Sequence, residues 1–135
     1  MRKNFLQGAL ISAFILSSCG NLYTYEYSIV NKSKYAIEVY YHTLDKAYDT
    51  TLIIAPGKEQ LIFVAHDSVD LHRAPYSRVV EYDIDTISIT CKGRETTKNY
   101  IANNSWEYSY STKMGNRVGW YTAYISNGDF TKGKQ

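Results

Sequence analysis

The sequence predicts an all-β protein: an antiparallel β-sandwich of the immunoglobulin-like kind with about seven to nine short strands. Apolar and polar residues alternate with a period of two over most of the chain after Leu22, and no stretch of about eleven residues or more has the 3.6-residue periodicity of an amphipathic helix. Turn-forming residues separate the alternating runs at short intervals and leave no room for helical crossovers. A small β-barrel is the alternative that fits the same patterns.

The first two strands are expected at residues 23–30 and 35–42, because bulky apolar and aromatic residues occupy every second position in both runs. The polar tetrapeptide Asn31-Lys32-Ser33-Lys34 stands between them. Two alternating runs joined by a short polar turn are typical of a β-hairpin. We therefore expect these two strands to pair with each other in the antiparallel sense.

The next two strands flank the dipeptide Pro56-Gly57. Residues 50–55 form the third expected strand, and Pro56-Gly57 suits the central positions of a type II turn, because Pro fixes φ and Gly accepts a positive φ. Residues 61–64 are apolar on both faces, which predicts a central strand. Residues 66–78 are mainly polar and are expected to form a loop.

The second half of the chain supplies the remaining strands, with a turn at Lys92-Gly93 and a loop at Asn103-Asn104-Ser105. The expected strands are residues 79–84, 86–91, 94–100, 106–111 and 118–125. All the strands belong to one sandwich domain, residues 23–130, and a flexible tail of residues 131–135 follows it.

The N-terminus has the pattern of a secretory signal peptide. Arg2 and Lys3 supply a positive start, residues 5–16 are mostly apolar, and small residues follow. The apolar run is too short for a spanning helix, which needs about 20 residues. We expect residues 1–18 to be removed, which leaves 13 basic and 13 acidic residues. A mature chain without net charge does not suit generic nucleic-acid binding, so no nucleic-acid partner is expected.

The segment Leu16-Ser17-Ser18-Cys19 resembles the lipobox of bacterial lipoproteins. The resemblance implies that Cys19 becomes the first residue and carries the lipid that binds the membrane, and that residues 19–22 form a short tether. Gly20, in place of the Asp associated with inner-membrane retention, implies an outer-membrane lipoprotein of the cell envelope. No acidic run follows Cys19, which favours a periplasm-facing orientation over surface exposure. A free secreted protein cut near Ser18 and an uncleaved amphipathic start are the alternatives.

Cys91 is the other cysteine of the chain. If Cys19 is acylated, no intrachain disulfide can form, despite an oxidising export compartment. Cys91 lies on the apolar side of the alternating run 87–91, which predicts a small buried hydrophobic residue and not a reactive thiol.

Several turns and strands follow one another in a recognisable order along the mature chain. They are Ala55-Pro56-Gly57, residues 82–89, Lys92-Gly93, residues 121–125 and residues 127–130. This order resembles that of small β-sandwich lipoproteins of Bacteroidetes-type bacteria. The resemblance implies the fold and the envelope location, and it carries over no catalytic residue.

No pattern in the chain indicates catalysis, a metal site or a cofactor. Residues 66–72 contain two His and two Asp, but their spacing matches no established metal motif, so a solvated loop is expected. No nucleophile lies in a sharp turn of the Gly-x-Ser-x-Gly kind. The alternation of acidic residues at Glu81, Asp83 and Asp85 predicts a solvated row of like charge on one strand face. It does not predict the acid and base in opposed environments that glycoside hydrolysis requires.

The aromatic residues are the strongest candidates for a binding site. Trp106, Tyr108 and Tyr110 are expected on one face of a strand, and Trp120 and Tyr124 on one face of another. Large rings with polar tips suit binding surfaces and can stack on sugars. The same rings also fill half-buried sandwich positions for structural reasons alone.

Three tyrosines near the predicted anchor have two interpretations. Tyr23, Tyr25 and Tyr27 follow Cys19 closely, and aromatic rings favour the membrane interface. They are equally suited to the core face of the first strand.

The sequence therefore leads us to expect a non-catalytic, lipid-anchored envelope protein that acts through contacts with another envelope protein. One alternative is a glycan- or peptide-binding accessory lipoprotein that uses exposed Trp and Tyr side chains. Another is an inhibitor or immunity-type lipoprotein. A glycan binder should expose Trp106 and Trp120 on one face, whereas a scaffold or inhibitor should expose an apolar patch.

Overall fold

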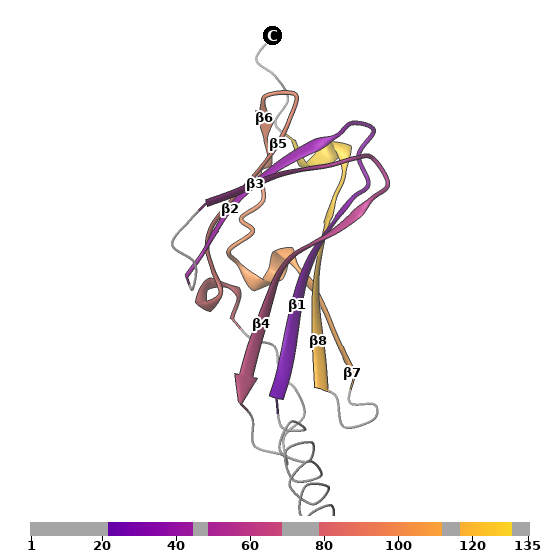
Figure 1. The fold of residues 1–135 in the computed structure, drawn as a ribbon. Coiled ribbons are helices and arrows are strands. Elements are labelled where there is room, and N and C mark those ends of the chain that lie inside the picture. Colours follow the sequence, from indigo (N-terminus) through magenta and orange to yellow (C-terminus); the bar gives the residue numbers. More distant parts are fainter. Residues whose placement is uncertain (1–21, 45–48, 69–78, 112–116, 131–135) are drawn as a thin grey trace, which may run out of the picture.

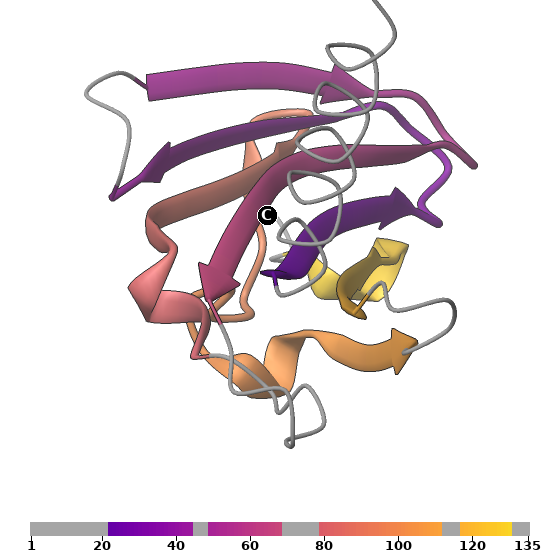
Figure 2. The same cartoon turned by 60° about the horizontal axis from the view of Figure 1, so that its bottom comes forward.

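A computed structural model of the chain describes residues 22–44, 49–68, 79–111 and 117–130. Two four-stranded sheets face each other, and the two views in Figures 1 and 2 show β2 and β3 lying apart from β1, β7 and β8. The first sheet has the order β4 (Glu59–Ser68), β1 (Leu22–Asn31), β8 (Arg117–Ile125), β7 (Glu107–Ser111). The second has the order β3 (Asp49–Ile54), β2 (Ile37–Thr43), β5 (Ile84–Cys91), β6 (Arg94–Glu95). The predicted all-β sandwich is confirmed.

The central pair of the first sheet, β1 and β8, is parallel, and Tyr27 lies opposite Tyr121 in its register. All the other strand pairs are antiparallel. The expectation of purely antiparallel sheets is therefore wrong for this pair. The alternation of residues marks a strand but does not specify its direction, and the closing strand runs the same way as the opening one.

The expected hairpin between the first two strands does not form, because β1 belongs to the first sheet and β2 to the second. The side chain of Asn31 stabilises the corner at which the chain passes from β1 in one sheet to β2 in the other. Its buried side-chain amide donates to the carbonyl oxygens of Tyr35 (2.8 Å) and Ile54 (2.9 Å), and its Oδ1 accepts from the amide and the hydroxyl of Ser33 (2.9 and 2.7 Å). The chain therefore crosses between the sheets here without leaving buried polar groups unpaired.

A second corner, between β3 and β4, lies against the first. Gly57 has a φ of +75° and the amide of Lys58 donates to the carbonyl oxygen of Ala55 (3.1 Å), as the predicted type II turn requires. The amide of Gly57 donates to the Asn31 carbonyl (2.7 Å), and the amide of Asn31 donates to the Lys58 carbonyl (2.9 Å). The two corners hold each other at one end of the sandwich.

Strand β4 is an edge strand and not the expected central one, because it pairs only with β1. The register shifts between Tyr27, opposite Phe63, and Ser28, opposite Leu61, so that Ile62 is an extra residue. This bulge turns both Ile62 and Phe63 inward, where both are buried. The apolar run thus reflects an irregular edge and not burial of both sheet faces.

Two expected strands and one expected loop differ from the observed elements. A 3₁₀ turn, η2 (Val80–Tyr82), precedes β5 where a strand was expected over residues 79–84. β6 contains only Arg94–Glu95, and a single bridge between Thr96 and Phe130 follows it. The expected loop at residues 103–105 is a 3₁₀ turn, η3 (Asn103–Ser105). Short polar segments of this kind carry no periodicity from which their local conformation could be predicted.

The core is rich in tyrosine. The inner face of the first sheet supplies four almost fully buried tyrosine side chains, Tyr23, Tyr25, Tyr27 and Tyr121. Tyr27 stacks on Tyr121 with ring centroids 4.8 Å apart, and it meets Trp106 edge-on at 5.6 Å. Such pairs each contribute about 0.5–1.5 kcal/mol beyond the burial of their area. The tyrosines nearest the predicted anchor therefore serve the core.

The sandwich has two distinct ends. The end where β1 begins, which we call the proximal pole, also contains the C-terminal ends of β4 and β7 and the start of β8 (Figure 1). The opposite end, the distal pole, contains the two corners, the Lys92-Gly93 turn and η5 (Asn127–Asp129).

Candidate functional site

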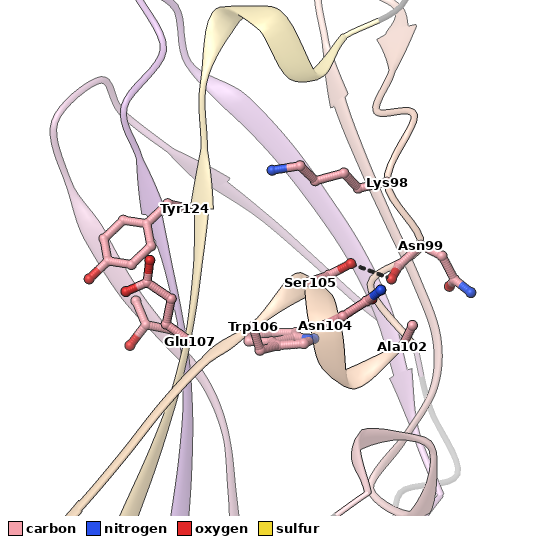
Figure 3. Close-up of a pocket in the computed structure, with 9 residues that line it drawn as sticks. Lys98, Asn99, Ala102, Asn104, Ser105, Trp106, Glu107 and Tyr124 are labelled. Carbon is pink, nitrogen blue, oxygen red and sulfur yellow. Dashed lines mark hydrogen bonds between the residues drawn. The ribbon is translucent and has the colours of Figure 1, made fainter.

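A pocket of about 630 Å³ lies between β7 and β8 on one side and the segment that contains η3 on the other (Figure 3). Its lining is mostly polar and contains amide, hydroxyl, carboxylate and aromatic groups. The lining residues are Lys98, Asn99, Ala102, Asn104, Ser105, Trp106, Glu107, Thr122 and Tyr124. We call this the η3 pocket.

One wall of the η3 pocket is a loop that folds over a buried tryptophan. The Trp106 indole N–H donates to the carbonyl oxygen of Tyr100 (2.8 Å), and only 6% of the Trp106 side chain is exposed. The hydroxyl of Ser105 donates to the Asn99 carbonyl (2.6 Å), a bond drawn in Figure 3. The loop is thereby fixed in place, and Asn104 is left exposed at the rim.

The other wall comes from the outer face of the first sheet. Glu107 of β7 lies opposite Thr122 of β8, and Tyr124 lies two residues further along the same face. Figure 3 shows Glu107 and Tyr124 across the pocket from Asn99 and Asn104. The ammonium of Lys32 lies 4.1 Å from the centroid of the Tyr124 ring, which steadies that ring.

The charge of Lys98 is already paired. Its ammonium lies 3.0 Å from a carboxylate oxygen of Asp129. Burial of Asp129 would raise its pKa, but hydrogen bonds from Ser126 and the nearby Lys98 outweigh this effect and lower the pKa below its ordinary value of 3.8. The pocket therefore offers hydrogen-bonding groups, an aromatic ring and the single carboxylate of Glu107, which suits a polar ligand without negative charge.

The five aromatic candidates divide between opposite faces of the first sheet. Trp106 is buried, Tyr108 is half-buried and Tyr110 is 53% exposed along the inner side. Trp120 is 37% exposed on the outer face, where its indole donates to a carboxylate oxygen of Glu26 (3.0 Å). The two tryptophans therefore do not form a shared platform. Of the five candidates, Trp106 and Tyr124 line the η3 pocket.

Tyr108 and Tyr110 stack on each other with centroids 6.2 Å apart. Burial, together with the neighbouring hydroxyl groups of Tyr25, Tyr110 and Tyr23, raises the pKa of Tyr108 to about 12. Its ring also covers Gly119 of β8, whose added Cβ would lie 2.9 Å from a ring carbon of Tyr108. These two tyrosines extend the core toward the proximal pole.

Sequence reasoning missed the polar wall of the pocket. The sequence pattern places Asn99 in an expected strand and Asn104 and Ser105 in an expected loop, and nothing in it distinguishes Lys98. The one available signal was the concentration of Asn and Ser just before an aromatic strand. That composition marks a loop but does not reveal what the loop folds against.

Two further predictions concern the acidic residues 81–85 and Cys91. Asp83 is buried and its carboxylate accepts a hydrogen bond from Tyr27, so it does not belong to the expected solvated acidic line, whereas Glu81 and Asp85 are exposed. Cys91 is buried, as predicted, and among the described residues its thiol is free.

Some predicted features lie partly or wholly outside the described residues. Among the residues that the structure describes, no three His, Cys, Asp or Glu side chains gather to hold a metal ion. Residues 69–72 of the His- and Asp-containing segment, the signal segment with Cys19, and the tail of residues 131–135 lie outside the described part.

Comparison of the sequence and the fold with known proteins finds no matching family model, no matching curated protein and no matching solved structure. Within the described ranges, no helix is long and apolar enough to cross a membrane.

Proposed function

We propose that the chain is a non-catalytic, lipid-anchored protein of the cell envelope that acts through contacts with another envelope protein. The observation that carries this proposal is the short distance along the chain between the lipobox-like cysteine and the folded domain. β1 begins at Leu22, three residues after Cys19, and Tyr23 is already fully buried. An extended chain of three residues spans about 10 Å. A lipid on Cys19 would therefore hold the proximal pole close to the membrane and direct the distal pole away from it.

The anchor would make the attachment durable. A single acyl chain gives only marginal and reversible membrane binding, whereas two or three chains together hold a protein firmly. With the proximal pole held at the membrane, the surfaces available to a partner are the flanks of the sandwich and the distal pole.

Cell fractionation tests the anchor. Cys19→Ala should move the protein from the membrane fraction to the soluble fraction and should abolish incorporation of labelled palmitate. Cys91→Ala is the matched control, because it removes the other thiol and should leave both results unchanged. Palmitate incorporation by the Cys19→Ala variant, or its continued sedimentation with membranes, would show that the anchor is wrongly assigned.

Protease treatment of intact cells tests the orientation. The periplasm-facing orientation requires that the sandwich resist protease until the cells are lysed. Digestion in intact cells would place it on the outer surface and would favour a glycan or another external ligand.

A second function, glycan or peptide binding, is favoured by the composition of the η3 pocket. Asn104, Ser105 and Glu107 offer hydrogen-bond donors and acceptors beside the half-buried ring of Tyr124. Polar groups that surround an aromatic ring are suited to sugars, which combine hydroxyl groups with an apolar ring face.

Screening the full chain on a glycan array tests this second function. A glycan that binds in the pocket should lose affinity by about tenfold with Tyr124→Ala, which corresponds to about 1.4 kcal/mol. Asn104→Ala should also weaken binding. Tyr82→Ala, which removes an exposed tyrosine that does not line the pocket, is the control and should leave the affinity unchanged. Equal losses with Tyr82→Ala and Tyr124→Ala would exclude the pocket as the binding site.

A further inference from the structure

The distal pole gathers the positive charge of the described part of the chain. Arg117 starts β8 at the proximal pole, and the other described lysine and arginine residues lie at or near the distal pole. They are Lys32, Lys34, Lys58, Lys92, Arg94 and Lys98. Four acidic residues, Glu38, Glu59, Glu95 and Asp129, lie near the same pole, so this end of the sandwich has an excess of two positive charges.

Three of these cations surround a second pocket, of about 480 Å³, which we call the basic pocket. Lys34, Lys92 and Arg94 line it together with the amide of Asn127. Its apolar surface comes from Cys91, Phe130 and the ring of Tyr35.

The walls of the basic pocket are held in place by contacts of their own. The ammonium of Lys92 lies 3.3 Å from the centroid of the Tyr35 ring. The backbone amide of Lys34 donates to Oδ1 of Asn127 (3.0 Å), which ties the first corner to η5. Lys92 also has a positive φ of +51°, a conformation that Asn, Asp or Gly would adopt more readily in this turn. The contact with Tyr35 gives the lysine at this position a role besides the turn.

In the described part of the chain, no carboxylate is paired with any of these three cations, Lys34, Lys92 and Arg94. The nearby Lys98, by contrast, is paired with Asp129. Glu95 follows Arg94 directly in β6 and so points to the opposite face of the sheet. The cations repel one another across the pocket, and an anion placed between them would relieve that repulsion.

We infer that the basic pocket receives a carboxylate side chain, followed by an apolar side chain, from the partner protein. Three cations and an apolar surface in one pocket match an acidic residue beside an aromatic or aliphatic one, and the volume suits one or two side chains. A polyanion such as a nucleic acid would require a longer basic track. This inference rests on the proposed function and specifies the chemistry of the partner.

Peptide binding to the full chain in detergent tests the inference by calorimetry. The probes are short Gly- and Ser-rich peptides with a central Glu-Phe, Gln-Phe, Glu-Ser or phosphoserine-Phe pair. The Glu-Phe peptide should bind, and the Gln-Phe peptide should bind about tenfold more weakly. Lys92→Gln and Arg94→Gln should each weaken Glu-Phe binding severalfold, whereas Lys58→Gln, a cation of the same pole outside the pocket lining, should not.

Equal binding of the Glu-Phe and Gln-Phe peptides, or no binding of either, would overturn the inference. Tighter binding of the phosphoserine peptide, or displacement of Glu-Phe by inorganic phosphate, would also overturn it, because the pocket would then be a phosphate site. None of these binding results depends on Cys19. Failure of peptide binding would therefore overturn the inference about the basic pocket and leave the proposed lipid anchor untouched. Failure of the fractionation test would overturn the anchor and leave peptide binding unaffected.

Discussion

The hydroxyl of Tyr27 donates a 2.6 Å hydrogen bond to Oδ2 of Asp83, and both side chains are buried. Tyr27 belongs to β1 of the first sheet, whereas Asp83 immediately precedes β5 of the second. The bond therefore joins the two layers through the middle of the core. It also explains how a carboxylate can lie inside a sandwich that is otherwise held together by apolar and aromatic contacts.

Removal of this hydroxyl should cost stability. Tyr27→Phe leaves the ring stacked on Tyr121 but deprives the Asp83 carboxylate of a short hydrogen bond. We expect the free energy of unfolding in urea to fall by about 2–3 kcal/mol, the range for a lost bond to a buried charged group. Tyr82→Phe makes the same chemical change at an exposed tyrosine and should change the free energy of unfolding by less than about 0.5 kcal/mol. Equal urea midpoints for the two variants would show that the bond contributes nothing.

Gly119 is required by the ring of Tyr108. A Cβ at position 119 would lie 2.9 Å from a ring carbon and 3.0 Å from the hydroxyl of Tyr108, and 3.0 Å from a ring carbon of Tyr25. We expect Gly119→Ala to reduce the free energy of unfolding by about 1–3 kcal/mol through overpacking. Gly128→Ala is the matched control, because an added Cβ there meets nothing within 4 Å. A Gly119→Ala variant as stable as Gly128→Ala would mean that the two tyrosines move aside freely.

The sequence was sufficient to locate most strands but not to assign them to sheets. Alternation over residues 118–125 predicted β8 to within one residue of its observed start at Arg117. The corner at Asn31 has the composition of a hairpin turn. Only the three-dimensional structure shows that the Asn31 side chain bonds to carbonyl groups on both sides of a crossing between layers.

The positions of the aromatic residues could also be predicted only in part from the sequence. The period of two correctly placed Trp106, Tyr108 and Tyr110 on one side of their segment. Which side faces the core depends on the register with β8, where Tyr108 lies opposite the buried Tyr121. The η3 pocket was harder still to predict, because its amide wall comes from a loop whose position is fixed by two bonds, from Ser105 to Asn99 and from Trp106 to Tyr100.

The protein should lose stability in alkali because of its buried tyrosines. Burial, with a smaller effect of Asp129, raises the pKa of Tyr100 to about 12, and the pKa of Tyr108 is also raised to about 12. The unfolded chain releases these protons near the ordinary tyrosine pKa of 10.0, so the stabilisation is complete below pH 10 and is lost as the pH rises toward 12. Tyrosinate absorbance should show these groups ionising together with unfolding. Tyr100→Phe should lose less stability between pH 10 and 12 than the unmodified chain, and an equal loss would contradict this assignment.

Asp129 should make the protein sensitive to acid. Because its pKa lies below 3.8 in the folded state, it stabilises the fold above that pH, and the stabilisation is lost as the pH falls through the folded-state pKa. Asp129→Asn should lower the free energy of unfolding by about 1–2 kcal/mol at neutral pH, since it weakens the cap of η5 and the ion pair with Lys98. The difference between the two proteins should vanish in strong acid. A difference that stays constant from neutral pH to strong acid would show that the charge of Asp129 is not its source.

The strongest test of the fold concerns the first corner. Asn31→Asp keeps the shape of the side chain but replaces the amide that donates to the carbonyl oxygens of Tyr35 and Ile54 with a buried carboxylate that faces them. We expect the free energy of unfolding at neutral pH to fall by about 3–5 kcal/mol, as for an uncompensated buried charge.

The pH dependence of the stability of Asn31→Asp distinguishes the cost of a buried charge from the cost of a change in side-chain shape. Burial against two carbonyl oxygens should raise the pKa of the new carboxyl group in the folded state, so the variant should recover part of its deficit, relative to the unmodified chain, as the pH falls and the group becomes neutral. Asn127→Asp is the control, because the exposed Asn127 accepts from the amide of Lys34 through its oxygen, and a carboxylate can do the same. If Asn31→Asp and Asn127→Asp unfold at the same urea concentration at neutral pH, the bonds of Asn31 do not hold the two sheets together at this corner.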